Sequence, residues 1–457
     1  MGVSVGQDRP DLRRVLGLWD SVAIIVGVIV GSGIFFAPTA VAQYLPHTGT
    51  ILCVWLLAGL TALSGALTYA ELGARWPHTG GMYVFIRECF GPLPSFIYGW
   101  GQLLIARPAS VAAISVVCAQ YVAFFVPVPT FGIKLLAVTA ILIVSIINYL
   151  GVRLTSVVQN FLTSIKVLAL MLIAVAALVF YRNIGGGTAA EVFPNTLQLS
   201  FWSAFGLALV VAFWASDGWS EITNVAGEIR DPARTIPLAL LIGTVLIVVL
   251  YMLVNGAYLH VLGVSGVQAS DRVAADTMIR VLGPLGGSLI SIAVVISTLG
   301  SLNGTTLTGP RIYFAMAVDG LFFPWAKKVD PKYRSPSIAI ALQALLAVPL
   351  VITWRFEQLA TFFVFVSLIF YALVASAVFR LRRMPGVPAA GGYKTWGYPV
   401  TPVFFLLVAA GILINTAVRA PLQAIMTFAI LLSGVPVFFL WKGRRKESLI
   451  SSDRTDA

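Results

Sequence analysis

The triplet Gly31-Ser32-Gly33 lies inside the first long apolar stretch of the chain, from Val22 to Ala42. Within a bilayer the backbone N–H and C=O groups need internal partners, so a helix unwinds there only where it lines a cavity or packs against protein. Two glycines around a serine lower helix propensity and leave backbone N–H groups free to hold an anion. We therefore predict that this triplet breaks the helix and binds a carboxylate.

A second long apolar stretch is interrupted in the same way, by Phe213-Trp-Ala-Ser-Asp-Gly-Trp219. Asp217 beside Gly218 at bilayer depth is costly unless the carboxylate faces a cavity or a partner. A helix that ends here exposes backbone carbonyls near Trp214, and such carbonyls attract an amine. A carboxylate site on one break and an amine site on the other together predict an α-amino acid as the ligand.

Each of these features also has a purely structural interpretation. Gly27 and Gly31 have the GxxxG spacing by which membrane helices pack closely. The second interruption favours a site instead, because paired interruptions at corresponding positions are typical of transporter sites. Trp214 could be a packed aromatic side chain. Asp217 could bind a cationic substrate side chain, or it could cap a helix with only its carbonyl in the site.

Two cations lie inside other apolar stretches. Lys166 sits deep in an apolar helix and must face the interior of the bundle. It could contact the substrate, but a fixed ammonium that ties two helices together, where a sodium-coupled protein would bind its ion, is the more economical interpretation. Arg107 precedes Pro108, and for this arginine we favour a structural ion pair or snorkelling to the interface.

The elements that position these residues are membrane-spanning helices. Of the 457 residues, 59% are hydrophobic and 11% are charged, whereas globular domains carry about 25% charge. A span needs about 20 mainly apolar residues. The sequence predicts an all-α polytopic membrane protein with twelve spans, at 18–44, 49–73, 92–125, 132–150, 158–181, 201–228, 236–262, 277–309, 335–353, 357–380, 398–418 and 422–441.

The two interrupted spans are the first and the sixth, so each opens one half of a five-plus-five arrangement. An odd number of spans in each half means that the second half runs inverted, as in transporters built on inverted repeats. We therefore divide the chain into a cytoplasmic N-terminus (1–17), a first repeat (18–181), a second repeat (201–380), two further spans (398–441) and a cytoplasmic tail (442–457).

The net charge of +12 is a topology signal and does not indicate nucleic acid binding. Alternate loops and the two ends hold 22 of the 30 Lys and Arg residues. This is the positive-inside pattern, and it predicts that both termini lie in the cytoplasm. We expect a multi-pass protein of the cell (inner) membrane, with the lipid bilayer and a small molecule as its partners.

Other function classes fit the sequence poorly. A membrane-embedded enzyme would need a catalytic cluster such as paired Asp or His-rich motifs within spans, and the three histidines are scattered. A channel would need a filter or charged rings around a pore. The three cysteines form no plausible disulfide or metal framework. We therefore predict a protein that is not an enzyme and that uses no metal and no cofactor.

Several stretches of the chain together resemble a known family. Six stretches, in order from the first span to the eighth, resemble the amino acid–polyamine–organocation (APC) superfamily, and within it the L-type amino acid transporters and the bacterial serine/threonine exchangers. The stretches are Gly27–Phe35, Thr79–Tyr83, Leu103–Ser110, Val158–Lys166, Phe213–Trp219 and Gly300–Gly304 with Pro310-Arg311.

The resemblance implies a LeuT-type fold and sodium-independent amino acid transport, commonly by exchange. It implies that the amides from Ser32 to Ile34 hold the substrate carboxylate and that the carbonyls of Ile29, Trp214 and Asp217 hold the amine. It also makes Trp214 an aromatic gate and Lys166 the lysine that replaces sodium. The site residues expected are Ile29, Gly31, Ser32, Gly33, Ile34, Trp214, Ala215, Ser216, Asp217 and Gly218, with Lys166 beside them.

Two departures from the family pattern affect this interpretation. The family often has Tyr where this chain has Ser216, which changes the expected size of the side-chain pocket. The loop from Val126 to Gly132 lacks the cysteine that joins animal members to a heavy chain, so we expect no disulfide-linked partner. The sequence favours an exchanger of neutral L-amino acids. The alternatives are a proton-coupled amino acid symporter and a carrier of cationic amino acids or polyamines.

Overall fold

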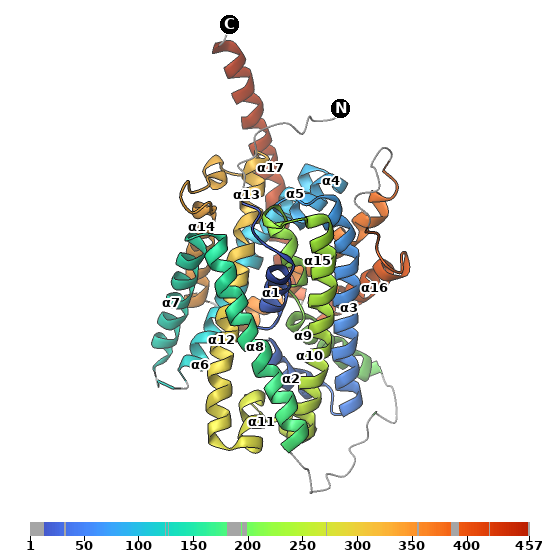
Figure 1. Ribbon diagram of the computed structural model, residues 1–457. Coiled ribbons are helices and arrows are strands. Elements are labelled where there is room, and N and C mark those ends of the chain that lie inside the picture. The colour runs from blue at the N-terminus through green and yellow to red at the C-terminus, as the bar shows by residue number, and fades with distance from the viewer. Residues whose placement is uncertain are drawn as a thin grey trace.

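The computed structural model describes residues 13–455 except for Ser32, Phe124, Pro127, 181–192, 194–198, Asp271, 354–355, 385–392 and Ala420. These residues form helices and one isolated bridge between Leu16 and Ile229. Figure 1 shows the helices as a bundle whose long members run in the same general direction. The all-α fold class predicted from the sequence is confirmed.

The helices, in chain order, have the following bounds. They are α1 (Leu18–Ile29), α2 (Gly33–Tyr44), α3 (Thr48–Arg75), α4 (Met82–Phe90), α5 (Pro92–Gly101), the π-helix η1 (Gln102–Ala106), α6 (Arg107–Val122), α7 (Thr130–Tyr149), α8 (Val152–Phe180), α9 (Leu199–Ala215), the 3-10 helix η2 (Trp219–Glu228), α10 (Pro232–Gln268), α11 (Val273–Leu282), α12 (Pro284–Thr308), α13 (Pro310–Val318), the 3-10 helix η3 (Pro324–Lys327), α14 (Ser337–Thr353), α15 (Phe356–Leu381), α16 (Val400–Arg419) and α17 (Pro421–Thr455).

The described residues contain ten helical segments that are long and apolar enough to cross a membrane, some of them made of consecutive helices such as α5, η1 and α6. Helices α1 and α2 make an eleventh if the bent pair is one span. The predicted span at 335–353 corresponds to α14, a shorter apolar helix of 17 residues. The predicted count of twelve is therefore not confirmed. The predicted span at 277–309 begins too early, because residues 273–282 form the separate helix α11, which ends at Gly283 with φ at 70°.

Both predicted breaks are present. Helix α1 ends at Ile29 and α2 begins at Gly33, and the two helices are bent by 42°. Helix α9 ends at Ala215 and η2 begins at Trp219. Gly218 precedes η2 with φ at 119°, a conformation that L side chains rarely adopt, so glycine is required at this point.

The two breaks lie against each other near the centre of the bundle. A Cβ atom added at Gly33 would lie 2.7 Å from the Cα atom of Ala215, so the start of α2 and the end of α9 touch through their backbones. Helix α1 packs against α8, α10, α12 and η2, and it lies inside the bundle in Figure 1. The broken segments are therefore enclosed by protein, where unwound backbone is tolerated.

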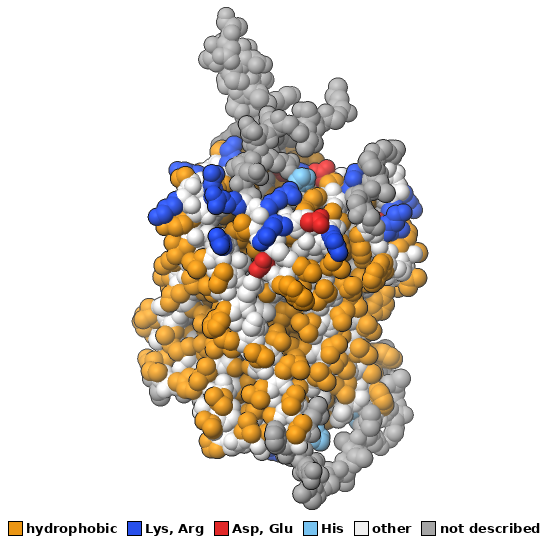
Figure 2. Space-filling view, viewed as in Figure 1, with side chains coloured by type: hydrophobic (Ala, Val, Ile, Leu, Met, Phe, Trp, Pro, Cys, Tyr) orange, Lys and Arg blue, Asp and Glu red, His pale blue; other side chains and the backbone are white. Residues whose placement is uncertain are grey.

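The outer surface of the bundle is apolar, as a bilayer requires. Large side chains such as Leu135, Ile146 and Leu168 are exposed on it. Figure 2 shows hydrophobic side chains over most of the visible face, with Lys and Arg gathered at the end where α4, α5 and α13 lie in Figure 1. A charged end and an apolar belt are typical of a multi-pass membrane protein.

Helix η2, which follows the second break, is held by buried contacts at its C-terminal end. The side chain of Glu228 accepts a hydrogen bond from Nε of Arg311 at 2.9 Å, and both side chains are fully buried. The backbone carbonyl of Glu228 accepts hydrogen bonds from the N–H groups of Val15 and Leu16. These contacts hold η2 against α13 and the segment before α1.

Candidate binding site between the two helix breaks

A cavity of about 60 Å³ lies between the two breaks. A single water needs about 10–15 Å³ measured with a water-sized probe, so the cavity has room for a ligand of several heavy atoms. Its wall comes from both breaks and from α6, α12 and α15. The described residues that line it are Val28, Ile29, Gly31, Gly33, Arg107, Ala109, Ser110, Ala113, Ile114, Trp214, Ala215, Asp217, Gly218, Glu221, Ser301, Thr305 and Phe363.

The carboxylate half of the predicted site is the start of α2. Gly31 and Gly33 line the cavity, and Gly33 is the first residue of α2. The first N–H groups of a helix have no partner inside it, and the helix dipole makes this end attractive to an anion. Ser32 lies outside the described residues. Ile34 is fully buried and does not line the cavity.

The amine half of the predicted site is the end of α9 with the end of α1. Ile29, Trp214 and Asp217 line the cavity. The Trp214 carbonyl accepts a hydrogen bond from the N–H of Asp217 at 3.3 Å. The Ile29 carbonyl accepts from Gly31 N–H at 2.7 Å and from Tyr251 at 3.0 Å. An amine that binds to the Ile29 carbonyl would therefore have to displace one of these donors.

The remaining residues of the second break divide between two cavities. Ala215 and Gly218 line the main cavity, whereas Ser216 lines a smaller one beside Trp55, Thr244 and Tyr251. The Ser216 hydroxyl donates to the Ala212 carbonyl at 2.9 Å. The Ser216 side chain therefore does not border the cavity whose size it was expected to change.

Asp217 lies at the wall of the main cavity, two residues before the start of η2. Helix η2 begins after Gly218, with no side-chain capping hydrogen bond. The Oδ1 atom of Asp217 is buried and has no hydrogen-bond partner among the described residues. The carboxyl group of Asp217 also has the Tyr371 hydroxyl as a neighbour.

Lys166 is buried behind the first break. Its ammonium donates to the carbonyl oxygens of Gly27 at 2.8 Å, Val30 at 2.7 Å and Ser297 at 2.8 Å, and to the Ser301 hydroxyl at 3.3 Å. The side chain is fully buried, and it does not line the main cavity. It therefore ties α8 to α1 and α12, as the structural interpretation of this lysine predicts.

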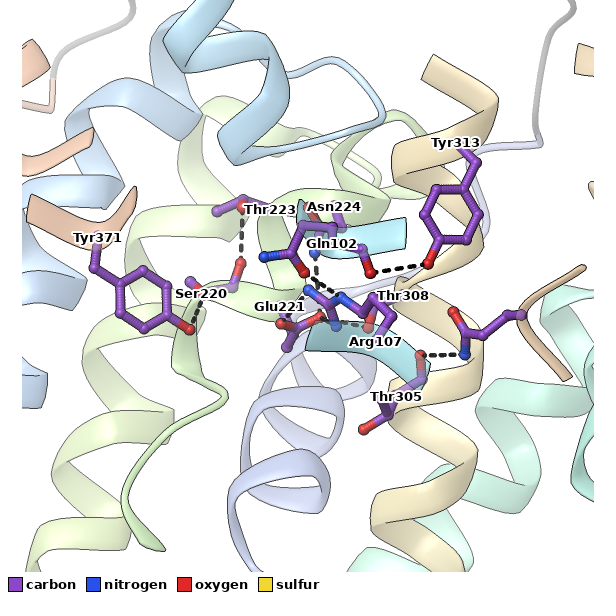
Figure 3. Close-up of polar contacts among 11 residues, drawn as sticks. Gln102, Arg107, Ser220, Glu221, Thr223, Asn224, Thr305, Thr308, Tyr313 and Tyr371 are labelled. Atoms are coloured by element: carbon purple, nitrogen blue, oxygen red, sulfur yellow. Dashed lines mark hydrogen bonds and ion pairs between the residues drawn. The ribbon is translucent and has the colours of Figure 1, made fainter. Parts of the chain in front are cut away.

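Arg107 makes the structural ion pair that the sequence favoured, and its partner is Glu221. The two guanidinium NH₂ groups lie 2.6 and 2.7 Å from the two carboxylate oxygens, and each side chain is 5% exposed. Figure 3 shows the pair joining α6 to η2, with Gln102, Asn224 and Thr308 around it. The π-helix η1 immediately precedes Arg107, and Pro108 has no N–H for a regular helical bond.

Sequence reasoning missed two residues that hold the breaks in place. Glu221 lies inside the predicted span 201–228, and an intramembrane carboxylate signals a buried partner, so it could have been found. Tyr251 gave no such signal. Its hydroxyl lies 3.0 Å from the Ile29 carbonyl and 3.1 Å from the Ala215 carbonyl, so it bridges the ends of α1 and α9.

A bundle of membrane-spanning helices that encloses a cavity between two broken helices is the architecture of a secondary transporter. Comparison with known proteins gives the family. The chain belongs to the amino acid permease family, whose family model matches residues 16–438, and so to the APC superfamily.

Its relatives are similar over nearly their whole length. The serine/threonine exchanger SteT of Bacillus subtilis (strain 168) is 31% identical over 441 residues, which cover 95% of this chain and 98% of the relative. The human b(0,+)-type amino acid transporter 1 is 31% identical, with 94% and 88% covered. The human cystine/glutamate transporter is 29% identical, with 95% and 87% covered. The protein is an amino acid transporter of the membrane and not an enzyme.

Proposed function

We propose that this chain exchanges neutral L-amino acids across the cell (inner) membrane by alternating access, without sodium. The observation that carries the proposal is the Lys166 ammonium, which is held by two carbonyls at the end of α1 and by a carbonyl and a hydroxyl of α12. Unwound carbonyls at a broken helix coordinate sodium in sodium-coupled transporters. Here a fixed cation of the chain uses such oxygens, so no external cation is needed to neutralise them.

The proposed substrate pose uses the opposite polarities of the two breaks. The amides from Ser32 to Ile34, at the start of α2, hold the carboxylate. The carbonyls of Trp214, Asp217 and Ile29 hold the amine, with the Ile29 carbonyl released from one of its present donors. Trp214 closes over the substrate. This pose is supported by the shared cavity that Gly33, Trp214 and Asp217 line.

Transport then follows from movement of one group of helices against the other. The bundle of spans one, two, six and seven rocks against spans three to five and eight to ten, and the inner half of span one swings aside to release the substrate. Because no driving ion binds in the site, return is faster with substrate bound, and this gives exchange. The division into repeats at 18–181 and 201–380 and the cytoplasmic positions of both termini remain predictions.

Neutral specificity is supported by the balance of charges in the cavity and by one relative's name. Arg107 and Glu221 neutralise each other there, and the serine/threonine exchanger is named for two neutral amino acids. One observation favours a second candidate, a carrier of cationic amino acids. The unpartnered Oδ1 of Asp217 could hold a cationic side chain. We expect the protein to act without a disulfide-linked heavy chain.

The test is uptake of labelled amino acids into proteoliposomes that hold the purified protein. We expect uptake that requires internal amino acid, that is unchanged when choline replaces sodium, and that an imposed proton gradient does not drive. Uptake that needs sodium, or that runs equally well into empty vesicles, would sink the exchanger proposal. Preference for L-lysine or L-arginine over neutral amino acids would establish the second candidate instead.

A further inference from the structure

The cavity wall includes an arginine whose hydrogen-bond donors are all bound to side chains of the protein. Three charged side chains, Arg107, Asp217 and Glu221, are among the described residues that line the cavity. A guanidinium in a binding cavity is a natural partner for a carboxylate, because its N–H groups match the two carboxylate oxygens. An acidic amino acid carries such a carboxylate on its side chain. The partner of Arg107 within the protein therefore determines whether an acidic amino acid can bind in the cavity.

In this structure the arginine binds a carboxylate of the chain itself. Both NH₂ groups of Arg107 donate to Glu221, at 2.6 and 2.7 Å. The remaining nitrogen, Nε, donates to Oε1 of Gln102 at 2.9 Å. Every nitrogen of the guanidinium thus has a protein partner, and the bidentate face, which a substrate carboxylate would use, is filled.

Glu221 is itself held in place by two further donors. Its Oε2 atom accepts hydrogen bonds from the Thr308 hydroxyl at 2.5 Å and from Nδ2 of Asn224 at 3.1 Å. Figure 3 shows these side chains converging on Glu221 from η2 and α12. A substrate carboxylate would have to displace a buried carboxylate from its whole set of partners, and a buried charge without partners is strongly unfavourable.

We propose that Glu221 determines substrate specificity by standing in for the side-chain carboxylate of an acidic amino acid on Arg107. With the pair intact, no nitrogen of the Arg107 guanidinium is left for the side-chain carboxylate of an acidic substrate. This inference rests on the proposed exchange of neutral amino acids, and it gives a structural cause for the preference for neutral over acidic amino acids. Aspartate and glutamate are excluded because the carboxylate of Glu221 already binds the guanidinium that their side-chain carboxylates would need.

The experiment measures selectivity in proteoliposomes loaded with a neutral amino acid. Exchange of labelled L-aspartate and L-glutamate is divided by exchange of the best neutral substrate, so that the amount of folded protein cancels. Glu221→Gln removes the charge and keeps the shape, and it should raise this ratio by at least about tenfold. The double variant Glu221→Gln with Arg107→Gln removes the cation as well and should return the ratio to the wild-type level. Thr308→Val, which removes only a donor to Glu221, should leave it low.

Two results would overturn the inference. One is a Glu221→Gln ratio equal to that of the wild type. The other needs no variant and so survives misfolding of Glu221→Gln: aspartate or glutamate competes with neutral exchange in the wild type as strongly as a neutral amino acid does. Failure of the proposed function gives a different result, because the wild type would then exchange no neutral amino acid at all.

Discussion

The ammonium of Lys166 lies 2.7 Å from the carbonyl oxygen of Val30, the residue that follows the last turn of α1. The last carbonyls of a helix have no partner inside it, and this end carries the negative pole of the helix dipole. A buried lysine at this position therefore satisfies groups that the break leaves open.

Replacing this lysine should create a sodium requirement. Lys166→Ala leaves the carbonyls of Gly27, Val30 and Ser297 without their cation, together with the Ser301 hydroxyl. Carbonyl and hydroxyl oxygens are the ligands that sodium uses in related architectures. We expect exchange by the variant to be lost in choline and partly restored in sodium. Lys134→Ala, at a partly exposed lysine that donates to the Ile352 carbonyl, is the control. Full activity of Lys166→Ala in choline would contradict the role given to this lysine.

Gly33→Ala should push the two breaks apart. The added Cβ would lie 2.7 Å from Cα and 2.9 Å from Cβ of Ala215, which is closer than real Cβ atoms approach other atoms. We expect substrate affinity to fall at least about tenfold, because the backbone must shift where the site is built. Gly256→Ala and Gly411→Ala are matched controls, since a Cβ added at either position meets nothing within 4 Å. Substrate affinity is measured by isothermal titration calorimetry. Equal affinity of Gly33→Ala and the controls would contradict the close contact between Gly33 and Ala215.

Tyr251→Phe should weaken the link between the two breaks without opening a large void. The variant loses the hydroxyl that lies 3.0 Å from the Ile29 carbonyl and 3.1 Å from the Ala215 carbonyl. A hydrogen bond of this kind contributes about 0.5–1.5 kcal/mol, so we expect a loss of thermal stability of that order and slower exchange. Tyr44→Phe, at an exposed tyrosine, should change neither. No change in melting temperature or exchange rate for Tyr251→Phe would show that the bridge has no role.

Cys89 should resist thiol reagents at neutral pH. This cysteine lies in α4, outside the spans, and burial raises the pKa of its thiol to about 12. Because the thiolate is the reactive form, the protonated thiol should remain unlabelled by maleimide at pH 7 and at pH 8.5. Labelling is read by mass spectrometry, with urea-unfolded protein as the positive control. Rapid modification of Cys89 in the folded protein at pH 7 would contradict its burial.

Much of the fold could be predicted because membrane-spanning helices are recognisable from the local sequence. Apolar length marks the spans, and small or polar residues such as Gly33 and Asp217 mark the two breaks. Lys166 could be placed in the interior of the bundle because a charged side chain within an apolar helix must avoid the lipid. Boundaries set by a single residue were harder: Gly283 separates α11 from α12 within a stretch that reads as one apolar span.

The pairing of side chains could not be predicted in the same way. Arg107 and Glu221 are 114 residues apart, and the contact depends on how η2 folds back toward α6. The π-helix before Arg107 has no sequence signal beyond Pro108. Tyr251 looks like any aromatic side chain in an apolar helix, and which cavity Ser216 faces depends on the turn at Gly218. These features follow from tertiary packing, and local patterns do not record it.

The central claim is that the two breaks supply opposite poles for one amino acid. The most direct test is competition binding to the purified protein with three ligands: the best neutral amino acid, its decarboxylated amine and its 2-hydroxy acid. We predict that both single-pole analogues bind at least about tenfold more weakly, because each lacks one set of charge-assisted hydrogen bonds. An amine that binds as tightly as the amino acid would contradict the carboxylate site at Gly31-Ser32-Gly33.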